Sequence, residues 1–299
     1  MPTKRIAARM RCSQQLVSYL IKRLKDNGHV SFTLQADTSR LGYEHIVVGI
    51  RYKRIIPARI RRIVETIRKA PQTTLVAEAK NGADLLLEFT SENLSAFSKQ
   101  FHSLLKDESD LLDIEFMMPV IVRRSYPRSY LSRGKREAKI LFGDRMMQPI
   151  EPLEEALLVQ LQEDARMPLI ELARRTDSSL QLVRSSISRL KEQGVMRGYT
   201  LAGDLGWAGI KTSWLFLSLP SEGLTSIDQV VSGAEGNPHV VGIIKLIGTY
   251  QIMLRIEEID AEEVLRGLRT TFDIERSNII EAVHIGLERP IPRGREKFS

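Results

Sequence analysis

Residues 167–196 read MPLIELARRTDSSLQLVRSSISRLKEQGVM, and residues 1–30 read MPTKRIAARMRCSQQLVSYLIKRLKDNGHV, an alignment without a gap at a constant spacing of 166 residues. Both stretches keep the Met-Pro opening, an Arg-Leu-Lys run and a late glycine, Gly28 or Gly194. A repeat period this long indicates two complete sets of domains rather than a solenoid of small units. We therefore expect the two halves of the chain to share one fold and one function.

The second copy predicts three helices. Apolar residues recur at helical spacing over 153–163, and Pro168 suits the first turn of a second, short helix. Ser179 belongs to a cluster of capping residues that starts a third helix, and Gly194 ends that helix as a left-handed cap. Two short helices joined by a tight polar turn are typical of a helix-turn-helix, whose last helix fits the major groove of DNA.

The two recognition helices are expected at 13–25 and 179–191, with Arg184 and Arg189 as the strongest individual candidates for DNA contact. Ser, Gln and Arg side chains can pair with base edges and phosphates, although any exposed helix face also carries polar residues. The candidate DNA-binding residues are Ser13, Gln14, Gln15, Ser18, Tyr19, Lys22 and Arg23 in the first copy and Ser179, Gln181, Arg184, Ser185, Ser188 and Arg189 in the second.

Strand-forming residues follow each recognition helix, at 30–34 and 195–201. They predict a strand pair, or wing, so we expect each helix-turn-helix to be winged. The first copy has no counterpart of the helix at 153–163, because Met1 aligns with Met167. Each buried aliphatic side chain of such a small core contributes roughly 1.5–3 kcal/mol. We therefore expect a looser first unit, unless the segment 135–149 or a partner chain covers the gap.

After each winged unit, the apolar pattern predicts strand, helix, strand, strand, helix, strand, with Asn81-Gly82 as a hairpin signal. This order is the ferredoxin-like fold, one antiparallel sheet with two helices on one face. The fold class is therefore α+β, with two winged helix-turn-helix domains alternating with two ferredoxin-like domains. The expected elements are 45–50, 57–69, 75–79, 84–89, 92–105 and 112–122 in the first copy and 210–219, 225–235, 239–247, 250–256, 260–271 and 277–287 in the second.

The expected domain boundaries follow from these elements. They are winged helix-turn-helix domains at 1–43 (first helix missing) and 152–207, ferredoxin-like domains at 44–123 and 208–289, a basic linker at 124–151 and a basic tail at 290–299.

This order of domains resembles the Lrp/AsnC family of prokaryotic transcription regulators, whose second domain is the RAM (regulation of amino-acid metabolism) domain. The best local matches are 169–200 and 240–256, where the family has a strand, a Gly-x-Tyr/Phe-Asp turn and a strand. Gln251 stands where the family prefers Asp. The resemblance implies a sequence-specific DNA-binding regulator that responds to an amino acid or another small effector. The effector-binding residues that it implies are Gly82, Asp84, Gly248 and Tyr250, which also have a simpler interpretation as turn residues.

The net charge of +7 is clustered. Residues 1–30 hold seven Lys and Arg against Asp26, which is +6, and residues 123–139 hold seven against Glu137, again +6. Clustering of this kind indicates a polyanion partner, here double-stranded DNA. The basic linker and tail either lie against phosphates or are solvated. The linker is also long enough for the chain to pair its own two sheet domains as an intramolecular pseudo-dimer, and we expect further homo-oligomers.

The composition, 42% hydrophobic and 27% charged over 299 residues, is ordinary for a globular protein with two or more domains. Apolar stretches are strand-sized, so we expect no membrane span, no signal peptide and a cytoplasmic protein. The single cysteine, Cys12, excludes an intramolecular disulfide and a multi-thiolate metal site, and it aligns with Ser178. We expect no catalytic residue, no metal and no cofactor.

Two alternatives remain. Siroheme decarboxylases of alternative haem synthesis share the two-domain architecture and would need His, Arg or Tyr residues that hold tetrapyrrole carboxylates. His239 and Arg255 are the nearest candidates, and the sequence contains no phosphate-cradling glycine loop, metal-ligand cluster or nucleophile motif. The other alternative is a ligand-sensing module whose DNA readers have decayed, as the missing first helix suggests.

Overall fold

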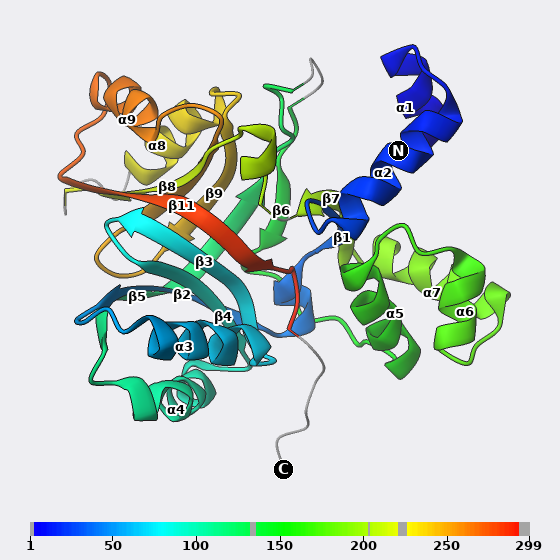
Figure 1. The fold of residues 1–299 in the computed structure, drawn as a ribbon, viewed down its shortest axis with the longest axis horizontal. Helices are drawn as coiled ribbons and strands as arrows, with labels where there is room; N and C mark the ends of the chain where they lie inside the picture. Colours follow the sequence, from blue (N-terminus) through cyan, green and yellow to red (C-terminus); the bar gives the residue numbers. More distant parts are fainter. Residues whose placement is uncertain (1–2, 132–135, 203, 221–225, 293–299) are drawn as a thin grey trace.

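The structure is a computed structural model that describes residues 3–131, 136–202, 204–220 and 226–292. Two sheet units lie together on one side of the molecule, and two helical heads project from the other side (Figure 1). Most of the expected basic tail at 290–299 lies outside the described residues, as do Arg133 and Lys135 of the basic linker.

Each sheet unit has the expected strand-helix-strand-strand-helix-strand order, so the predicted α+β fold class is confirmed. Pro57 begins the first helix of the first unit, and the side chain of Asn93 caps the second helix by accepting from the Ala96 amide at 2.8 Å. The elements are β2 (Glu44–Tyr52), α3 (Pro57–Lys69), β3 (Thr73–Asn81), β4 (Leu85–Ser91), α4 (Leu94–Leu105) and β5 (Leu112–Ser125) in the first unit and β8 (Thr212–Ser218), α8 (Ser226–Glu235), β9 (Val240–Leu246), β10 (Ile252–Glu257), α9 (Ala261–Arg269) and β11 (Arg276–Glu288) in the second.

The two sheets join edge to edge into one closed ring, referred to below as the central barrel. Its strand order is β2-β4-β3-β11-β8-β10-β9-β5, and a further antiparallel pairing of β5 with β2 closes it. The pairs β3–β11 and β5–β9 link the two halves, each by joining the second strand of one unit to the last strand of the other. The chain therefore contains the intramolecular pseudo-dimer that its length and linker permit.

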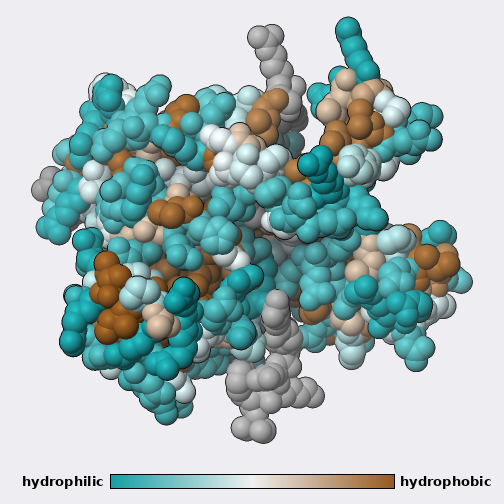
Figure 2. All heavy atoms as spheres, viewed as in Figure 1, coloured by the Kyte–Doolittle hydropathy of each residue, from teal (hydrophilic) through white to brown (hydrophobic). Residues whose placement is uncertain are grey.

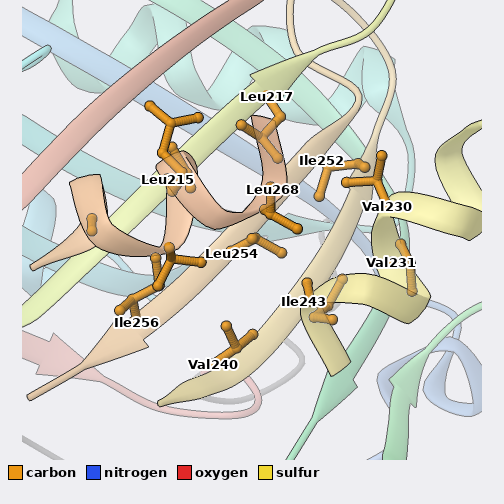
Figure 3. Packing of buried hydrophobic residues seen from close by; sticks show 14 of the residues in the cluster. Leu215, Leu217, Val230, Val231, Val240, Ile243, Ile252, Leu254, Ile256 and Leu268 are labelled. Atoms are coloured by element: carbon orange, nitrogen blue, oxygen red, sulfur yellow. The ribbon is translucent and has the colours of Figure 1, made fainter. Parts of the chain in front are cut away.

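Apolar side chains fill three layers of this barrel. The interior holds aromatic residues of both halves, with the rings of Phe116 and Phe216 centred 5.0 Å apart. Outside the second sheet, α8 and α9 cover a cluster that includes Leu215, Leu254 and Leu268 (Figure 3). On the first sheet, α3 and α4 cover the corresponding cluster. Strand residues thus alternate between the barrel interior and the helix-covered outer face, as the period of two requires.

The two recognition helices and the helix expected at 153–163 begin and end within one residue of their expected bounds. The Ser13 and Ser179 hydroxyls cap the recognition helices by accepting from the amides of Leu16 and Leu182, and Gly28 and Gly194 follow the helices with φ of +70° and +69°. The helices are α1 (Thr3–Met10) and α2 (Gln14–Asp26) in the first head and α5 (Pro152–Glu163), α6 (Leu169–Arg175) and α7 (Leu180–Glu192) in the second.

The prediction of a strand pair within each copy was wrong. Each copy supplies one strand, β1 (Ser31–Ala36) or β7 (Met196–Ala202), and the two pair antiparallel with each other. We call this two-stranded unit the wing sheet. Sequence patterns identified the strand-forming residues but carried no information on which copy would provide the partner. Because β1 pairs with β7, the wing sheet connects the two heads.

The linker also folds back on the molecule. Its strand β6 (Lys139–Phe142) pairs with the end of β5, and the Gln148 amide donates to the Arg40 carbonyl at 2.8 Å. Arg40 belongs to a short 3-10 helix, Thr38–Leu41, between β1 and β2. The segment 135–149 therefore packs on this junction where it is described, and not on α2.

The first head buries its inward side chains less completely than the second. Ile187 and Leu190 of α7 are 8% and 0% exposed beneath α5, whereas the equivalent Ile21 and Leu24 of α2 are only half-buried. Among the described residues, no helix occupies the place beside α2 that α5 occupies beside α7. Figure 2 accordingly shows hydrophobic residues on the surface of the first head, where Met10 is 58% exposed.

This difference predicts faster local opening of the first head. Hydrogen-exchange mass spectrometry should show α2 amides exchanging at least about tenfold faster than α7 amides, because fewer buried apolar contacts resist opening. The barrel strands provide the slow internal reference. Equal protection of the two recognition helices would contradict the prediction.

Candidate functional site

The first head is strongly cationic. Its two helices and the turn between them carry Lys and Arg at seven positions against Asp26 alone, and six of the seven are exposed. The seventh, Lys25, forms an ion pair with Asp164 of the second head at 2.7 Å. The exposed cations are Lys4, Arg5, Arg9, Arg11, Lys22 and Arg23. This surface has the electrostatic character that phosphate contact requires.

The second head has a complete three-helix core but little net charge. Residues 152–192 contain six Lys and Arg against seven Asp and Glu, which is −1. On α6, Arg174 and Arg175 both donate to Glu171, at 2.7 and 2.8 Å, and these hydrogen bonds lower the pKa of Glu171 to about 2. The two heads thus share a helix-turn-helix pair but differ in electrostatics, a difference that the repeat pattern did not predict.

Most of the predicted DNA-binding side chains lie exposed along the recognition helices. In α2 these are Gln14, Gln15, Ser18, Tyr19, Lys22 and Arg23, and in α7 they are Gln181, Arg184, Ser185 and Ser188. Gln14 donates to the Thr3 hydroxyl, and the Ser185 hydroxyl donates to a carbonyl of its own helix. Ser13 and Ser179 serve as helix caps, so their hydroxyls are already engaged.

Arg189 has a structural partner. Its guanidinium donates two hydrogen bonds, both 2.8 Å long, to the Glu154 carboxylate of α5. Glu154 is 1% exposed and also accepts from the Glu151 amide in a capping box. The pair therefore fastens α5 to α7. Arg184, in contrast, is exposed and forms no ion pair with any described residue.

The four effector-binding residues predicted from the resemblance gather at one end of the barrel, where each hairpin packs on the other half. A Cβ on Gly82 would collide with Asn278 of β11, and one on Gly248 would lie 3.0 Å from Met118 of β5. Tyr250 packs among Phe116 and Phe216 in the barrel interior. The close approach of strand residues explains both glycines as packing positions.

Two other polar side chains at these hairpins are also occupied. The Asp84 carboxylate accepts from the Tyr52 amide at 2.7 Å. Gln251, which departs from the family pattern, donates to the Gly248 carbonyl and accepts from the Leu219 amide. Its side-chain amide therefore joins the hairpin to the residue that follows β8.

In its described part, the basic segment 123–139 does not form an exposed phosphate-binding stripe. The linker was expected either to lie against phosphates or to be solvated, and its described arginines do neither. Arg123 pairs with Glu88, Arg124 with Glu235 and Arg128 with Glu257, each at 2.6 Å. The Arg136 guanidinium donates to backbone carbonyls near α8. These cations hold the linker against the barrel, because their acidic partners lie on its strands and helices. The partners are distant in the sequence, so the sequence pattern could not predict these pairs.

Several of these arginines surround a cavity of about 160 Å³. It lies where the wing sheet meets the end of the barrel opposite the two hairpins, which we call the barrel mouth. Both halves contribute lining residues, including Arg123 of β5 and Arg255 of β10. Glu88 and Arg255 hold matching interior positions in the two copies, since Glu88 faces Val47 of β2 and Arg255 faces Trp214 of β8. Sequence reasoning noted Arg255 but not this cavity.

A buried polar chain leads from the junction to the barrel mouth. The Thr38 hydroxyl lies 2.6 Å from His45 Nε2, and His45 Nδ1 lies 2.7 Å from Glu88. Burial lowers the pKa of His45 below its usual value of 6.5. The positive charge of Arg123 lowers this pKa further, whereas Glu88 raises it in part. Burial disfavours the charged form of Glu88, but Arg123 and His45 outweigh it and lower its pKa to about 2. This network ties the first head to the barrel.

Sequence comparisons relate this chain to DNA-binding regulators. A model of winged helix-turn-helix DNA-binding domains matches residues 150–195. The HTH-type transcriptional regulator Rv2324 of Mycobacterium tuberculosis is 27% identical over 134 residues, 44% of this chain and 90% of that protein. LrpA of the same organism is 27% identical over 139 residues, 45% of this chain and 92% of that protein. Less than half of this chain thus matches most of each regulator, consistent with a duplicated unit.

Similarity to a solved structure extends along the whole chain. The siroheme decarboxylase NirDL superposes with a TM-score of 0.61 and 14% sequence identity, covering 100% of this chain and 89% of that one. At this identity the similarity concerns the fold alone.

The chain is therefore a duplicated protein of winged helix-turn-helix and ferredoxin-like domains. Its resemblance to transcription regulators of the Lrp/AsnC type is confirmed. No described helix has the length and hydrophobicity needed to cross a membrane, and the described residues contain no cluster of three or more His, Cys, Asp or Glu suited to a metal ion.

The Glu154–Arg189 pair predicts different outcomes for the two arginines of α7. Arg189→Met should lower the melting temperature of the second head, because it leaves the Glu154 carboxylate buried without its cation. The matched control Arg184→Met should leave the melting temperature unchanged, since Arg184 is exposed. Circular dichroism melts check both variants, and equal stability of the two would contradict the assignment of Arg189.

His45 predicts a loss of stability in mild acid. Because its pKa is lower in the folded than in the unfolded protein, the unfolded protein takes up the proton first, and stability falls as the pH drops through 6.5. His45→Gln should reduce the fall in melting temperature between about pH 7.5 and 5.5. His102→Gln, at an exposed position of α4, is the control. An unchanged pH profile in His45→Gln would rule out this role.

Proposed function

We propose that the chain is a sequence-specific DNA-binding transcription regulator of the Lrp/AsnC type whose two heads contact one duplex. The observation that carries this proposal is the exposed recognition helix of each head, with a charge of +6 on the first head. Lys and Arg that neutralise DNA phosphates release counterions, and this release supplies most of the affinity that does not depend on the DNA sequence. Side chains along a recognition helix then select the bases.

The two heads divide this work unequally. The first head supplies the electrostatic attraction through exposed cations such as Lys22 and Arg23. The second head supplies the better-packed helix-turn-helix, on which Arg184 is the candidate for direct base or phosphate contact. Arg189 is less suited to DNA contact, because the pair with Glu154 holds its guanidinium against α5. The wing sheet ties both heads together.

We also propose that the tandem chain takes the place of a dimer. Two one-copy chains would supply two heads and two sheets, and this chain supplies both sets by itself through the pairs β3–β11 and β5–β9. The described residues therefore include both halves of a complete barrel in one chain.

A siroheme decarboxylase activity is the second candidate, favoured by the whole-chain similarity to the fold of NirDL and by the arginines of the barrel mouth. Two features weigh against it. The cavity of about 160 Å³ is smaller than the roughly 300–1,000 Å³ of drug-sized ligand sites, and a tetrapyrrole is larger still. In addition, His45 is buried and both of its ring nitrogens form hydrogen bonds, while His239 stacks on Tyr130 and pairs with Glu258. Both histidines are thus already engaged with protein groups. Mixing the protein with siroheme and following the visible spectrum separates the two functions, since a regulator leaves the spectrum unchanged.

The proposed division predicts the salt dependence of duplex binding. Lys22→Gln with Arg23→Gln should reduce the slope of log affinity against log salt by about 2, because each lost phosphate contact removes about 0.9. Arg184→Ala should reduce it by about 1. Fluorescence anisotropy with a labelled duplex at several salt concentrations measures both slopes.

Arg68→Gln on α3 is the control, since it removes a cation far from either recognition helix. Equal slopes for the wild type and all variants would show that the substituted residues of the recognition helices do not contact DNA phosphates. Absence of duplex binding by the wild-type chain, even at low salt, would refute the regulator itself.

A further inference from the structure

We propose that the barrel-mouth cavity is a binding site for a small organic monocarboxylate with an apolar, ring-sized body. The carboxylate is held by Arg123 and Arg255, one from each half of the chain. This site is distinct from the hairpin positions that the family resemblance indicated, because it lies at the opposite end of the barrel.

Charge at the mouth favours an anion. Five arginines line the cavity, against the carboxylates of Glu88 and Glu288, an excess of +3. Glu235 and Glu257 pair with two of these arginines, Arg124 and Arg128, from outside the lining and neutralise part of this charge. The positive excess among the lining residues favours an anionic ligand.

Hydrogen bonding at the mouth is incomplete. Arg123 pairs with Glu88, and Arg255 pairs with Glu257 and Glu288, yet the Nε atoms of both arginines have no hydrogen-bond partner among the described residues. Both side chains keep a part exposed, 25% for Arg123 and 16% for Arg255, and both line the cavity. Buried guanidinium groups normally have their donors satisfied. The Nε atoms themselves are buried, so a carboxylate in the cavity would bind the exposed part of each side chain, where its two oxygens match the planar N–H groups of a guanidinium.

The rest of the lining sets the body of the ligand. Leu34 and Leu201 of the wing sheet lie on one side, and Trp214 and Met253 of the barrel interior lie on the other. Such surfaces gain free energy when apolar groups displace water from them. A cavity of about 150 Å³ accommodates a benzene-sized molecule. A ligand in this cavity therefore touches both halves of the barrel and both strands of the wing sheet.

Trp214 makes the site directly observable, because it is 2% exposed, lines the cavity and shares the chain with only one other tryptophan, Trp207. In a Trp207→Phe background, its fluorescence is titrated with benzoate, phenylacetate and 4-methylpentanoate, each beside its neutral amide, and with inorganic phosphate. We expect a saturable change with at least one carboxylate and binding at least about tenfold weaker for its amide. No DNA is present, so the result is independent of the proposed regulator function.

Substitutions at the mouth complete the test. Arg255→Met and Arg123→Met should weaken carboxylate binding at least about tenfold. Arg255→Lys keeps the charge but not the planar pair of donors, so it should also weaken carboxylate binding. This variant keeps the test informative if Arg255→Met fails to fold. Arg51→Met, which removes an arginine that pairs with Glu115 away from the cavity, should bind like the parent.

Three results would overturn the proposal. They are the absence of saturable change with all three carboxylates up to about 10 mM, equal binding of acid and amide, and phosphate binding as tight as that of the best carboxylate.

Discussion

The structure depends on the pairing of sheet edges between the two halves of the chain. A four-stranded ferredoxin-like sheet leaves two edge strands whose backbone N–H and C=O groups have no partner. Here the edges of the first sheet, β3 and β5, pair with the edges of the second, β11 and β9. Both sheets lose their edges at once, and the aromatic interior of Phe116, Trp214 and Phe216 becomes enclosed. The wing sheet and the barrel mouth both combine residues of the two halves that this closure brings together.

Local structure could be predicted from the sequence to within a few residues. Helical periodicity and capping residues such as Ser13, Ser179 and Gly194 predicted the recognition helices, because these signals act within a few positions of the residue that carries them. The alternating strands and the Asn81 turn predicted the ferredoxin-like order for the same reason. Long-range partners could not be predicted in this way. The residues paired in the wing sheet, from Ser31 with Ala202 to Ala36 with Met196, are about 160 to 171 positions apart in the sequence, and no local pattern encodes such a pairing.

Charge was the least predictable feature. The runs at 1–30 and 123–139 each total +6 in the sequence, yet the first lies exposed on helices and the described part of the second turns toward buried carboxylates. Arg189 and Arg184 occupy neighbouring turns of α7, and only Arg189 finds an acidic partner on α5. Burial of Glu88, Glu154 and Glu257 decides these outcomes, since a buried carboxylate recruits a nearby cation. Neither that burial nor the cavity among the recruited arginines was visible before the fold was known.

The unequal heads have a consequence for the kind of DNA site that suits this protein. Regulators built from two identical chains favour palindromic sites, because the symmetry of the protein is mirrored in the duplex. A charge of +6 on one head and −1 on the other removes that symmetry, while each head keeps its helix-turn-helix pair. A target for this chain would have a left and a right half-site that are not interchangeable. Such a sequence fixes the polarity with which the protein sits on a promoter, which no symmetric dimer can do.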